Sequence, residues 1–217
     1  MTWFSPAYPV GAFSYSSGIE WAVEAGDIRD TVTLESWLAV VLREGAGLND
    51  GIFFAQSHSA AAGNDEEKLV AVAELAAAFV PTRERHLETT AQGRAFMDVT
   101  RAAWPCVALD RLQTLWDGAL AYPVVAGVAC AGHGIPLLPA LRALLTAISA
   151  NWVSAAVRLI PLGQTDSQRV LHALESVIAE TAKRAHDATL DDLGSATFRA
   201  DLASAHHEIQ YTRLFRS

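Results

Sequence analysis

The sequence predicts an all-α fold, a single-domain bundle of roughly eight to ten helices spanning residues 1–217. Apolar residues recur at helical spacing along most of the chain, as they do between Leu137 and Trp152. No run of alternating apolar and polar residues is bounded by hairpin turns, so no segment favours a strand. Neither a fixed-period repeat nor a low-complexity linker divides the chain, and its length suits one large helical domain.

Two capping boxes indicate where helices begin. The first is Ser17-Gly18-Ile19-Glu20, which predicts a helix to about Ala25, ended by Gly26. The second is Thr165-Asp166-Ser167-Gln168, which opens a helix to about His186. In each box a hydroxyl can accept from the third helical N–H, while the Glu or Gln side chain returns to the first residue.

Apolar stripes bounded by glycine, proline and short polar turns predict the remaining helices. Pro123 suits the first turn of one of them. They cover about residues 33–44, 50–62, 65–80, 82–101, 107–118, 123–130 and 137–152. A polar stretch, 187–194, follows the last long helix, and residues 195–217 are predicted to form a tail.

The composition bears on the classes of partner. Hydrophobic residues make up 51% of the chain and charged residues 18%, which indicates an apolar surface for partners or self-association. The net charge of −8 argues against nucleic-acid binding and against adsorption to anionic lipid, although it also fits acidity that serves solubility alone. Cys106 and Cys130 form no C-x-x-C pair, so we expect two buried thiols in a reducing cytoplasm.

One uncharged stretch could suggest a membrane-associated protein. Residues 118–141 carry no formal charge and are long enough to cross a bilayer. The Gly132-His133-Gly134-Ile135-Pro136 segment would break such a helix and leave backbone groups unpaired in lipid. We therefore expect two buried helices joined by a turn, with no membrane partner.

Motifs for catalysis or cofactor binding are scarce. The chain lacks a Walker-type glycine loop and a Gly-x-Ser-x-Gly elbow. No two of the seven histidines are four residues apart, and adjacent helical residues point about 100° apart. We therefore expect no intrinsic cofactor or metal, which leaves open a metal contact that is transient or made only in a complex. The alternative is a small helical metal-dependent hydrolase that uses His206, His207 and Glu208, the one local cluster.

Two segments are unusual for a scaffold. Residues 5–20 combine turn formers, aromatic rings and hydroxyl groups, and they could form either a packed cover on the bundle or a contact surface. Residues 209–217 combine Tyr211, Leu214 and Phe215 with Arg213 and Arg216, which are residue types that dominate interfaces. The competing interpretation of the second segment is a frayed chain end.

Four sequence elements resemble the UreF family of urease accessory proteins. They are S-P-A-Y-P-V-G-A-F-S-Y-S-S-G-I-E-W at residues 5–21, Y-P-V-V-A-G at 122–127, R-L-I-P-L-G-Q at 158–164, and H-E-I-Q-Y-T-R-L-F-R-S at 207–217. They occur in the family's order along nearly the whole chain. Two departures are the short stretch before Ser5 and Ala12 in place of the second glycine of a more usual Gly-Gly pair.

The resemblance implies a non-enzymatic, all-α homodimer. It also implies assembly with a UreD/UreH-type accessory protein and the UreG GTPase into a GTP-dependent chaperone that delivers nickel to apo-urease. Nickel and GTP would then be handled through the partners.

The resemblance also implies roles for particular residues. Residues 194–217 would be a partner-binding tail, and Tyr15 would lie near Arg213. Gln164 and Gln168, at a helix start, would line a passage for nickel. The tail residues implied to contact partners are His207, Glu208, Tyr211, Arg213, Leu214, Phe215 and Arg216.

Overall fold

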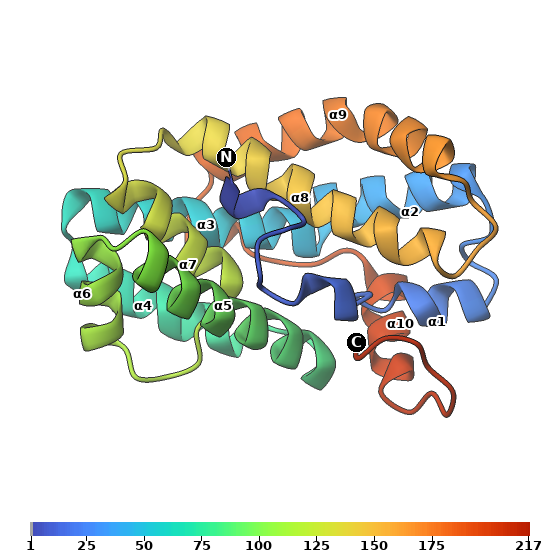
Figure 1. Cartoon of the computed structure of the whole chain (residues 1–217), viewed down its shortest axis with the longest axis horizontal. Helices are drawn as coiled ribbons and strands as arrows, with labels where there is room; N and C mark the ends of the chain where they lie inside the picture. The colour runs from blue at the N-terminus through green and yellow to red at the C-terminus, as the bar shows by residue number, and fades with distance from the viewer. Residues whose placement is uncertain (1) are drawn as a thin grey trace.

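A computed structural model describes residues 2–217, and within them the chain forms helices and loops without a strand (Figure 1). The predicted all-α fold is confirmed. The ten α-helices of the described residues are α1 (Ile19–Glu24), α2 (Thr31–Glu44), α3 (Ala46–Gly63), α4 (Glu66–Ala78), α5 (Arg83–Ala103), α6 (Val107–Leu115), α7 (Tyr122–Gly132), α8 (Leu137–Val157), α9 (Gln164–Asp187) and α10 (Phe198–His207). Short 3₁₀ turns η1 (Thr2–Phe4), η2 (Ala12–Ser14) and η3 (Leu190–Asp192) supplement them.

The core forms around α3 and α7, which pack against each other more extensively than any other pair of helices. Every residue of α7 from Tyr122 to Cys130 is buried. Gly127 permits this approach, because a Cβ there would collide with the Ser57 hydroxyl and the Phe54 carbonyl of α3. The helix with the most apolar sequence is therefore the one surrounded by others, as expected for a helix without a polar face.

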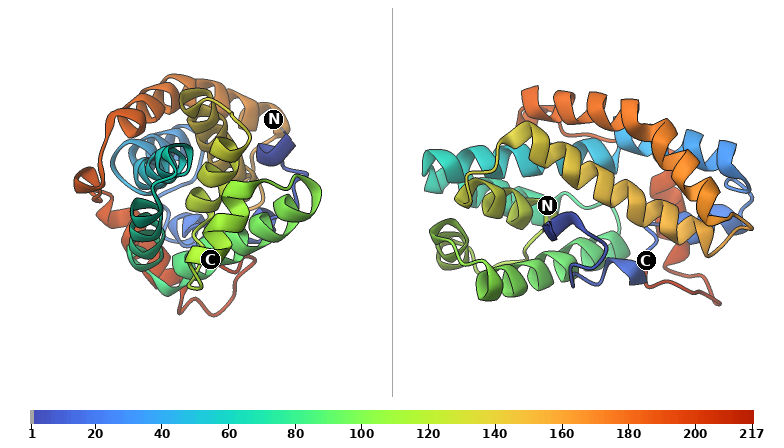
Figure 2. Two further views of the ribbon diagram at one scale, coloured as in Figure 1. Left: turned by 90° about the vertical axis from the view of Figure 1, so that its left-hand side faces the viewer. Right: turned by 45° about the horizontal axis from the view of Figure 1, so that its top comes forward.

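Two long helices, α8 and α9, lie side by side over this core (Figures 1 and 2). The buried face of α9 contains Val170, Leu174 and Ile178, as its apolar stripe predicts. The helix α8 is long and apolar enough to cross a membrane, but half of the relevant window is buried inside the protein. The uncharged stretch 118–141 is divided by a turn at 133–136, so it forms two helices as expected.

Both predicted capping boxes are wrong in their residues, although the helices exist. Ser17 does not cap α1. Its own φ is +56°, and Gly18, with φ +82°, precedes the helix instead. In α9 the helix begins earlier, at Gln164, because the Asp166 carboxylate accepts from the Gly163 N–H at 3.1 Å. At α1, tertiary contacts of the Ser17 hydroxyl replace the cap that the local pattern favours. At α9, the Asp166 carboxylate replaces it.

The predicted tail is partly helical. Residues 198–207 form α10, which packs against α1 and α5. No buried apolar stripe marks this helix, because Phe198 and Leu202 face outward while Ala203 and Ser204 face inward. Small residues make the contact with α1 possible, so the helix lacks the large buried apolar side chains on which periodicity depends.

Glycine is required at position 18 for two reasons, namely its left-handed φ of +82° and the close approach of α10. A Cβ at this position would lie 2.8 Å from the Ser204 nitrogen of α10. We expect Gly18→Ala to lower the free energy of unfolding by about 2 kcal/mol, because it adds left-handed strain to a backbone collision. Gly63→Ala is the control, since nothing lies within 4 Å of its new methyl group. Urea unfolding of both variants gives the comparison, and equal midpoints would refute the close-approach argument.

Candidate functional site

Segments from the two ends of the sequence lie side by side in the structure (Figures 1 and 2). The backbone N–H of Ser16 donates to the Ser217 carbonyl at 2.7 Å, and the N–H of Arg216 donates to the Ser14 carbonyl at 2.9 Å. Residues 208–217, here called the terminal segment, therefore run along residues 5–20, here called the N-terminal segment. The terminal segment is thus tied to the body of the protein, which contradicts the competing interpretation of a frayed chain end.

A third element, Arg158 at the end of α8, joins these two segments. Its guanidinium carbon lies 3.7 Å from the Phe13 ring centroid and 4.2 Å from that of Phe215. One guanidinium N–H also donates to the Phe13 carbonyl at 2.9 Å. Partial burial between the rings lowers the pKa of Arg158 from its ordinary value. Cation–π contacts with both rings thus fix Phe13 and Phe215 relative to α8.

The buried carboxylate of Glu20 in α1 holds the terminal segment by its backbone. It accepts the N–H groups of Leu214 and Phe215 at 2.6 and 2.9 Å. Its Oε2 also lies 3.0 Å from Nε2 of His207, which is fully buried. A carboxylate in a dry site needs several donors, and here each of them comes from residues 207–215.

Glu84 of α5 completes the contacts of His207. Its Oε2 lies 2.6 Å from Nδ1 of His207, and its Oε1 accepts from Arg213 at 2.6 Å. Both imidazole nitrogens therefore face carboxylate oxygens, so both can donate only when the ring carries two protons. The result is a hydrogen-bonded chain, Glu20–His207–Glu84–Arg213, whose first three members are buried.

One helical turn further along α5, Glu88 binds the last residue of the segment. Its Oε2 accepts from the Ser217 hydroxyl at 2.8 Å and from Arg85 at 2.6 Å. Arg85 also donates to the Ser17 hydroxyl at 2.6 Å, and Ser17 accepts from the Trp152 indole at 2.9 Å. The unusual backbone at Ser17 thus aims its hydroxyl into a polar network instead of capping α1.

Behind this network, Nη2 of Arg85 lies 4.0 Å from the carboxylate of Asp50 in α3, which is a long contact for an ion pair. Burial raises the pKa of Asp50 to about 6, an effect that nearby Glu88 increases and the Arg85 charge partly offsets. Asp50 is thus the weakly compensated acid of the site.

The structure divides the predicted partner-contacting residues into two groups. His207 and Phe215 are buried, as is Tyr15, and they contact the body of the protein. Arg213 pairs with Glu84, not with Tyr15, and Glu208 accepts from the Arg83 N–H at the start of α5. Tyr211, Leu214 and Arg216 are exposed. The first group positions the segment, and the second remains available for contact with another protein.

Gln164 and Gln168 are exposed on the first turns of α9. Neither residue lines the two large cavities of the described chain. Their role in nickel passage stays a prediction.

The hydrolase alternative is not supported. His206 is exposed and stacks on Trp21 with 5.0 Å between ring centroids, while His207 points into the core. Glu208 faces the start of α5. Across residues 2–217, no group of three or more His, Cys, Asp or Glu side chains is placed to hold a metal ion.

Comparison with known proteins identifies the family. A family model described as UreF matches residues 28–175. The chain belongs to the UreF family of urease accessory proteins. A urease accessory protein UreF of Bradyrhizobium diazoefficiens is 63% identical over the whole chain, which spans 90% of that protein. Two proteins of the same name from Rhodopseudomonas palustris, strains BisA53 and BisB5, are each 61% identical over the whole chain and are covered over 91% and 89% of their lengths.

The likeness to these UreF proteins includes the site. The relatives align over all 217 residues, so both the N-terminal segment and the terminal segment fall within the similarity. Sequence reasoning had missed Ser17, Glu84, Arg85 and Glu88 as parts of this site. Glu84, Glu88 and Gln92 share one face of α5 at four-residue spacing, and this polar row was the feature of the sequence that could have indicated the site. Nothing local indicated that this polar face is buried.

His207→Ala tests the buried hydrogen-bonded chain. We expect it to lower the free energy of unfolding by about 3 kcal/mol, because it leaves Glu20 and Glu84 buried without their shared donor. Amide hydrogen exchange should also accelerate at residues 208–217. His206→Ala is the matched control and should change stability by less than about 1 kcal/mol. Similar losses in both variants would contradict the proposed anchoring.

Asp50→Asn tests the buried carboxylate. The pKa of Asp50 is higher in the folded protein than in the unfolded chain. The free energy of unfolding of the wild-type protein therefore falls as pH rises from about 4 to about 6. Asparagine mimics the protonated form, so the variant should be more stable than the wild-type protein at pH 7.5, by about 3 kcal/mol. The gain should vanish near pH 4. Urea unfolding at both pH values measures it, and a pH-independent difference would rule this explanation out.

Proposed function

We propose that this chain is a non-enzymatic, cytoplasmic component of urease maturation that acts as a homodimer. In this proposal it joins a UreD/UreH-type accessory protein and the UreG GTPase in a GTP-dependent chaperone that assembles the nickel centre of apo-urease. Nickel is cargo, and GTP is bound by UreG. The observation that carries the proposal is the surface formed by the terminal segment, Arg158 and the N-terminal segment in a chain of the UreF family.

This surface combines a fixed backbone with exposed apolar side chains. Phe13 is 68% exposed, Leu214 is 64% exposed and Tyr211 is fully exposed, although the backbone of the terminal segment is hydrogen-bonded to Glu20. Holding a loop in place before binding reduces the entropy lost on association. The arrangement therefore favours a docking surface over a disordered tail that folds on its partner.

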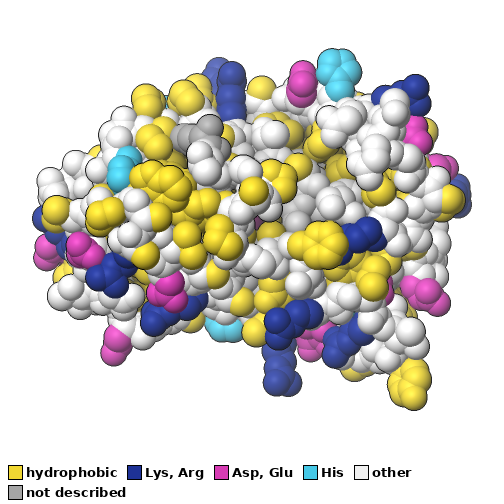
Figure 3. Space-filling view, viewed as in Figure 1, with side chains coloured by type: hydrophobic (Ala, Val, Ile, Leu, Met, Phe, Trp, Pro, Cys, Tyr) yellow, Lys and Arg dark blue, Asp and Glu magenta, His cyan; other side chains and the backbone are white. Residues whose placement is uncertain are grey.

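The charge of the surface indicates what its partner offers. Arg158, Arg213 and Arg216 lie among the exposed apolar side chains, on a protein of net charge −8. In Figure 3, hydrophobic and basic side chains lie together over the region where Figure 1 draws the terminal segment. We infer a partner surface with an apolar centre and acidic groups around it.

The combined variant Tyr211→Ala/Leu214→Ala tests this surface directly. We expect it to weaken binding to the UreD/UreH-type partner at least tenfold, since exposed aromatic and aliphatic anchors carry much of an interface's energy. Thermal stability should stay unchanged, because neither side chain is buried. Val107→Ala, equally exposed on α6 at the other end of the molecule, is the control (Figure 1). Calorimetric titration with the partner gives the affinities.

The whole proposal is tested in a strain that lacks only this gene. We expect urease protein to be made with little nickel and low activity, and both to return when the gene is restored. Fully loaded urease in the deletion strain would refute the function. Substituting leucine for Gln164 and Gln168 together in the restored gene should reduce nickel loading while the complex still assembles, if the two residues line the passage.

A further inference from the structure

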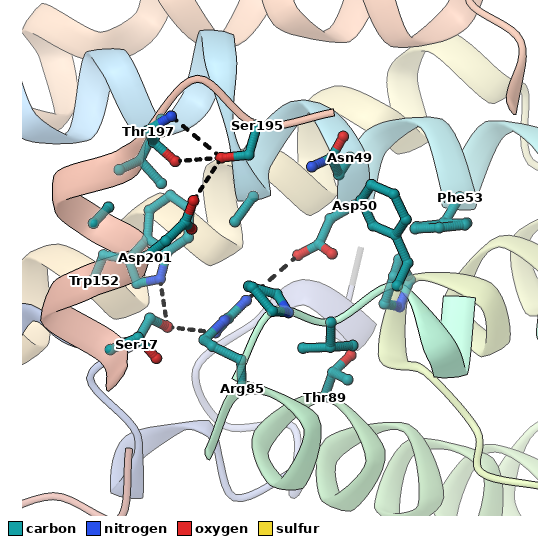
Figure 4. A pocket seen from close by; sticks show the side chains of 18 of the residues that line it. Ser17, Asn49, Asp50, Phe53, Arg85, Thr89, Trp152, Ser195, Thr197 and Asp201 are labelled. Atoms are coloured by element: carbon teal, nitrogen blue, oxygen red, sulfur yellow. Dashed lines mark hydrogen bonds and ion pairs between the residues drawn. The ribbon is translucent and has the colours of Figure 1, made fainter. Parts of the chain in front are cut away.

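A cavity of about 220 Å³ lies between α2, α3, α5 and α10, with the carboxylate of Asp50 at its inner wall (Figure 4). Its apolar walls include the aromatic side chains of Trp37, Phe53 and Phe79. The terminal segment contributes no residue to this lining. Ser17 and Ile19 of the N-terminal segment do line it, so the cavity adjoins the proposed docking surface without including any side chain of the terminal segment.

Asp50 has no close partner within residues 2–217. The nearest cation is Arg85, whose Nη2 lies 4.0 Å away, outside hydrogen-bond distance. The other terminal nitrogen of Arg85 is committed to Glu88 and Ser17 at 2.6 Å each. The side chain of Asp50 keeps 22% of its surface accessible, and it lines this cavity. Its oxygens can therefore accept from a molecule inside.

The surroundings of the cavity carry an excess of negative charge. Arg85 is the single guanidinium among Asp50, Glu88 and Asp201, each close enough to raise its pKa. Of these, Asp50, Asp201 and Arg85 line the cavity itself. An anion would meet uncompensated carboxylates, whereas a cation would relieve their repulsion.

The other polar groups of the lining already have partners. The Asn49 side chain exchanges hydrogen bonds with the backbone of Gly194, and the Ser195 hydroxyl donates to Asp201. Asp50 is thus the polar side chain of the lining that has no hydrogen-bond partner among the described residues. The lining also offers few groups that could fix a large polar ligand.

We propose that this cavity binds a small organic amine. The protonated amino group bonds to the Asp50 carboxylate, and the hydrocarbon part lies against Trp37, Phe53 and Phe79. A charge-assisted hydrogen bond in an apolar surrounding is strong, and aromatic walls bury alkyl groups well. This site goes beyond the proposed role in urease maturation and does not depend on it.

The pH dependence of binding follows from the state of Asp50. The charged groups that face it are Arg85 and Glu88 from α5 and Asp201 from α10, and Tyr122 of α7 is also near. No histidine lines the cavity. With a pKa of about 6, Asp50 is mostly ionised at pH 7.5 and mostly protonated at pH 5. Amine affinity should therefore fall about tenfold between these values.

The test is calorimetric titration of the full chain with three isosteric probes at equal ionic strength. We expect n-pentylammonium to bind with about millimolar affinity, and pentan-1-ol and pentanoate to bind at least tenfold more weakly. The indole N–H resonance of Trp37 should shift only with the amine in two-dimensional NMR spectra. Asp50→Asn should abolish the preference for the amine, whereas Asp98→Asn, an exposed carboxylate elsewhere on α5, should preserve it.

Three results would overturn the proposal. They are no binding of the amine, equal binding of the amine and the alcohol, and amine affinity that is the same at pH 5 and pH 7.5. The last two comparisons use the wild-type protein alone, so they decide the matter even if Asp50→Asn folds poorly. None of these outcomes bears on whether the chain supports urease maturation, which the gene deletion tests separately.

Discussion

The buried hydrogen-bonded chain of Glu20, His207 and Glu84 is the interaction on which the terminal segment depends. Two carboxylates on α1 and α5 are withdrawn from water, at a cost of several kcal/mol each if they lacked donors. The donors are His207, Arg213 and the backbone N–H groups of residues 214 and 215. The carboxylates of α1 and α5 therefore depend on these donors for their burial, and the terminal segment depends on the carboxylates for its position.

The same constraint explains why elements far apart in the sequence have one location in space. The N-terminal segment brings Phe13 and Ser16, the end of α8 brings Arg158, and the terminal segment brings Phe215 and Ser217. Each of these three elements contacts the other two, through Arg158 and the two phenylalanine rings and through the backbone bonds of residues 14–16 with residues 216–217. The resemblance to the UreF family had pointed to these elements as separate stretches of sequence, and the fold brings three of them to one surface.

Helical periodicity and helix-breaking proline and glycine residues predicted most of the helices well. Pro123 and the turn at 133–136 located α7 and α8, because proline and glycine act locally. The helix α10 was missed because small residues make its buried contact. The terminal segment lacks a repeating pattern, so the sequence could not tell that His207 and Phe215 face inward while Tyr211 and Leu214 face outward. The burial of Glu84 and Glu88 also depends on partners more than one hundred residues away.

The bond between residues 16 and 217 has a consequence for the order of folding. It closes a loop of nearly the whole chain, with a separation of 201 residues, so its entropy of closure is large and it should form after the local helix contacts. During synthesis, residues 207–217 must leave the ribosome before Glu20 and Glu84 acquire their donors. The contacts of residues 214–217 with residues 14–20 are thus absent from a nascent chain until residues 207–217 have been synthesised.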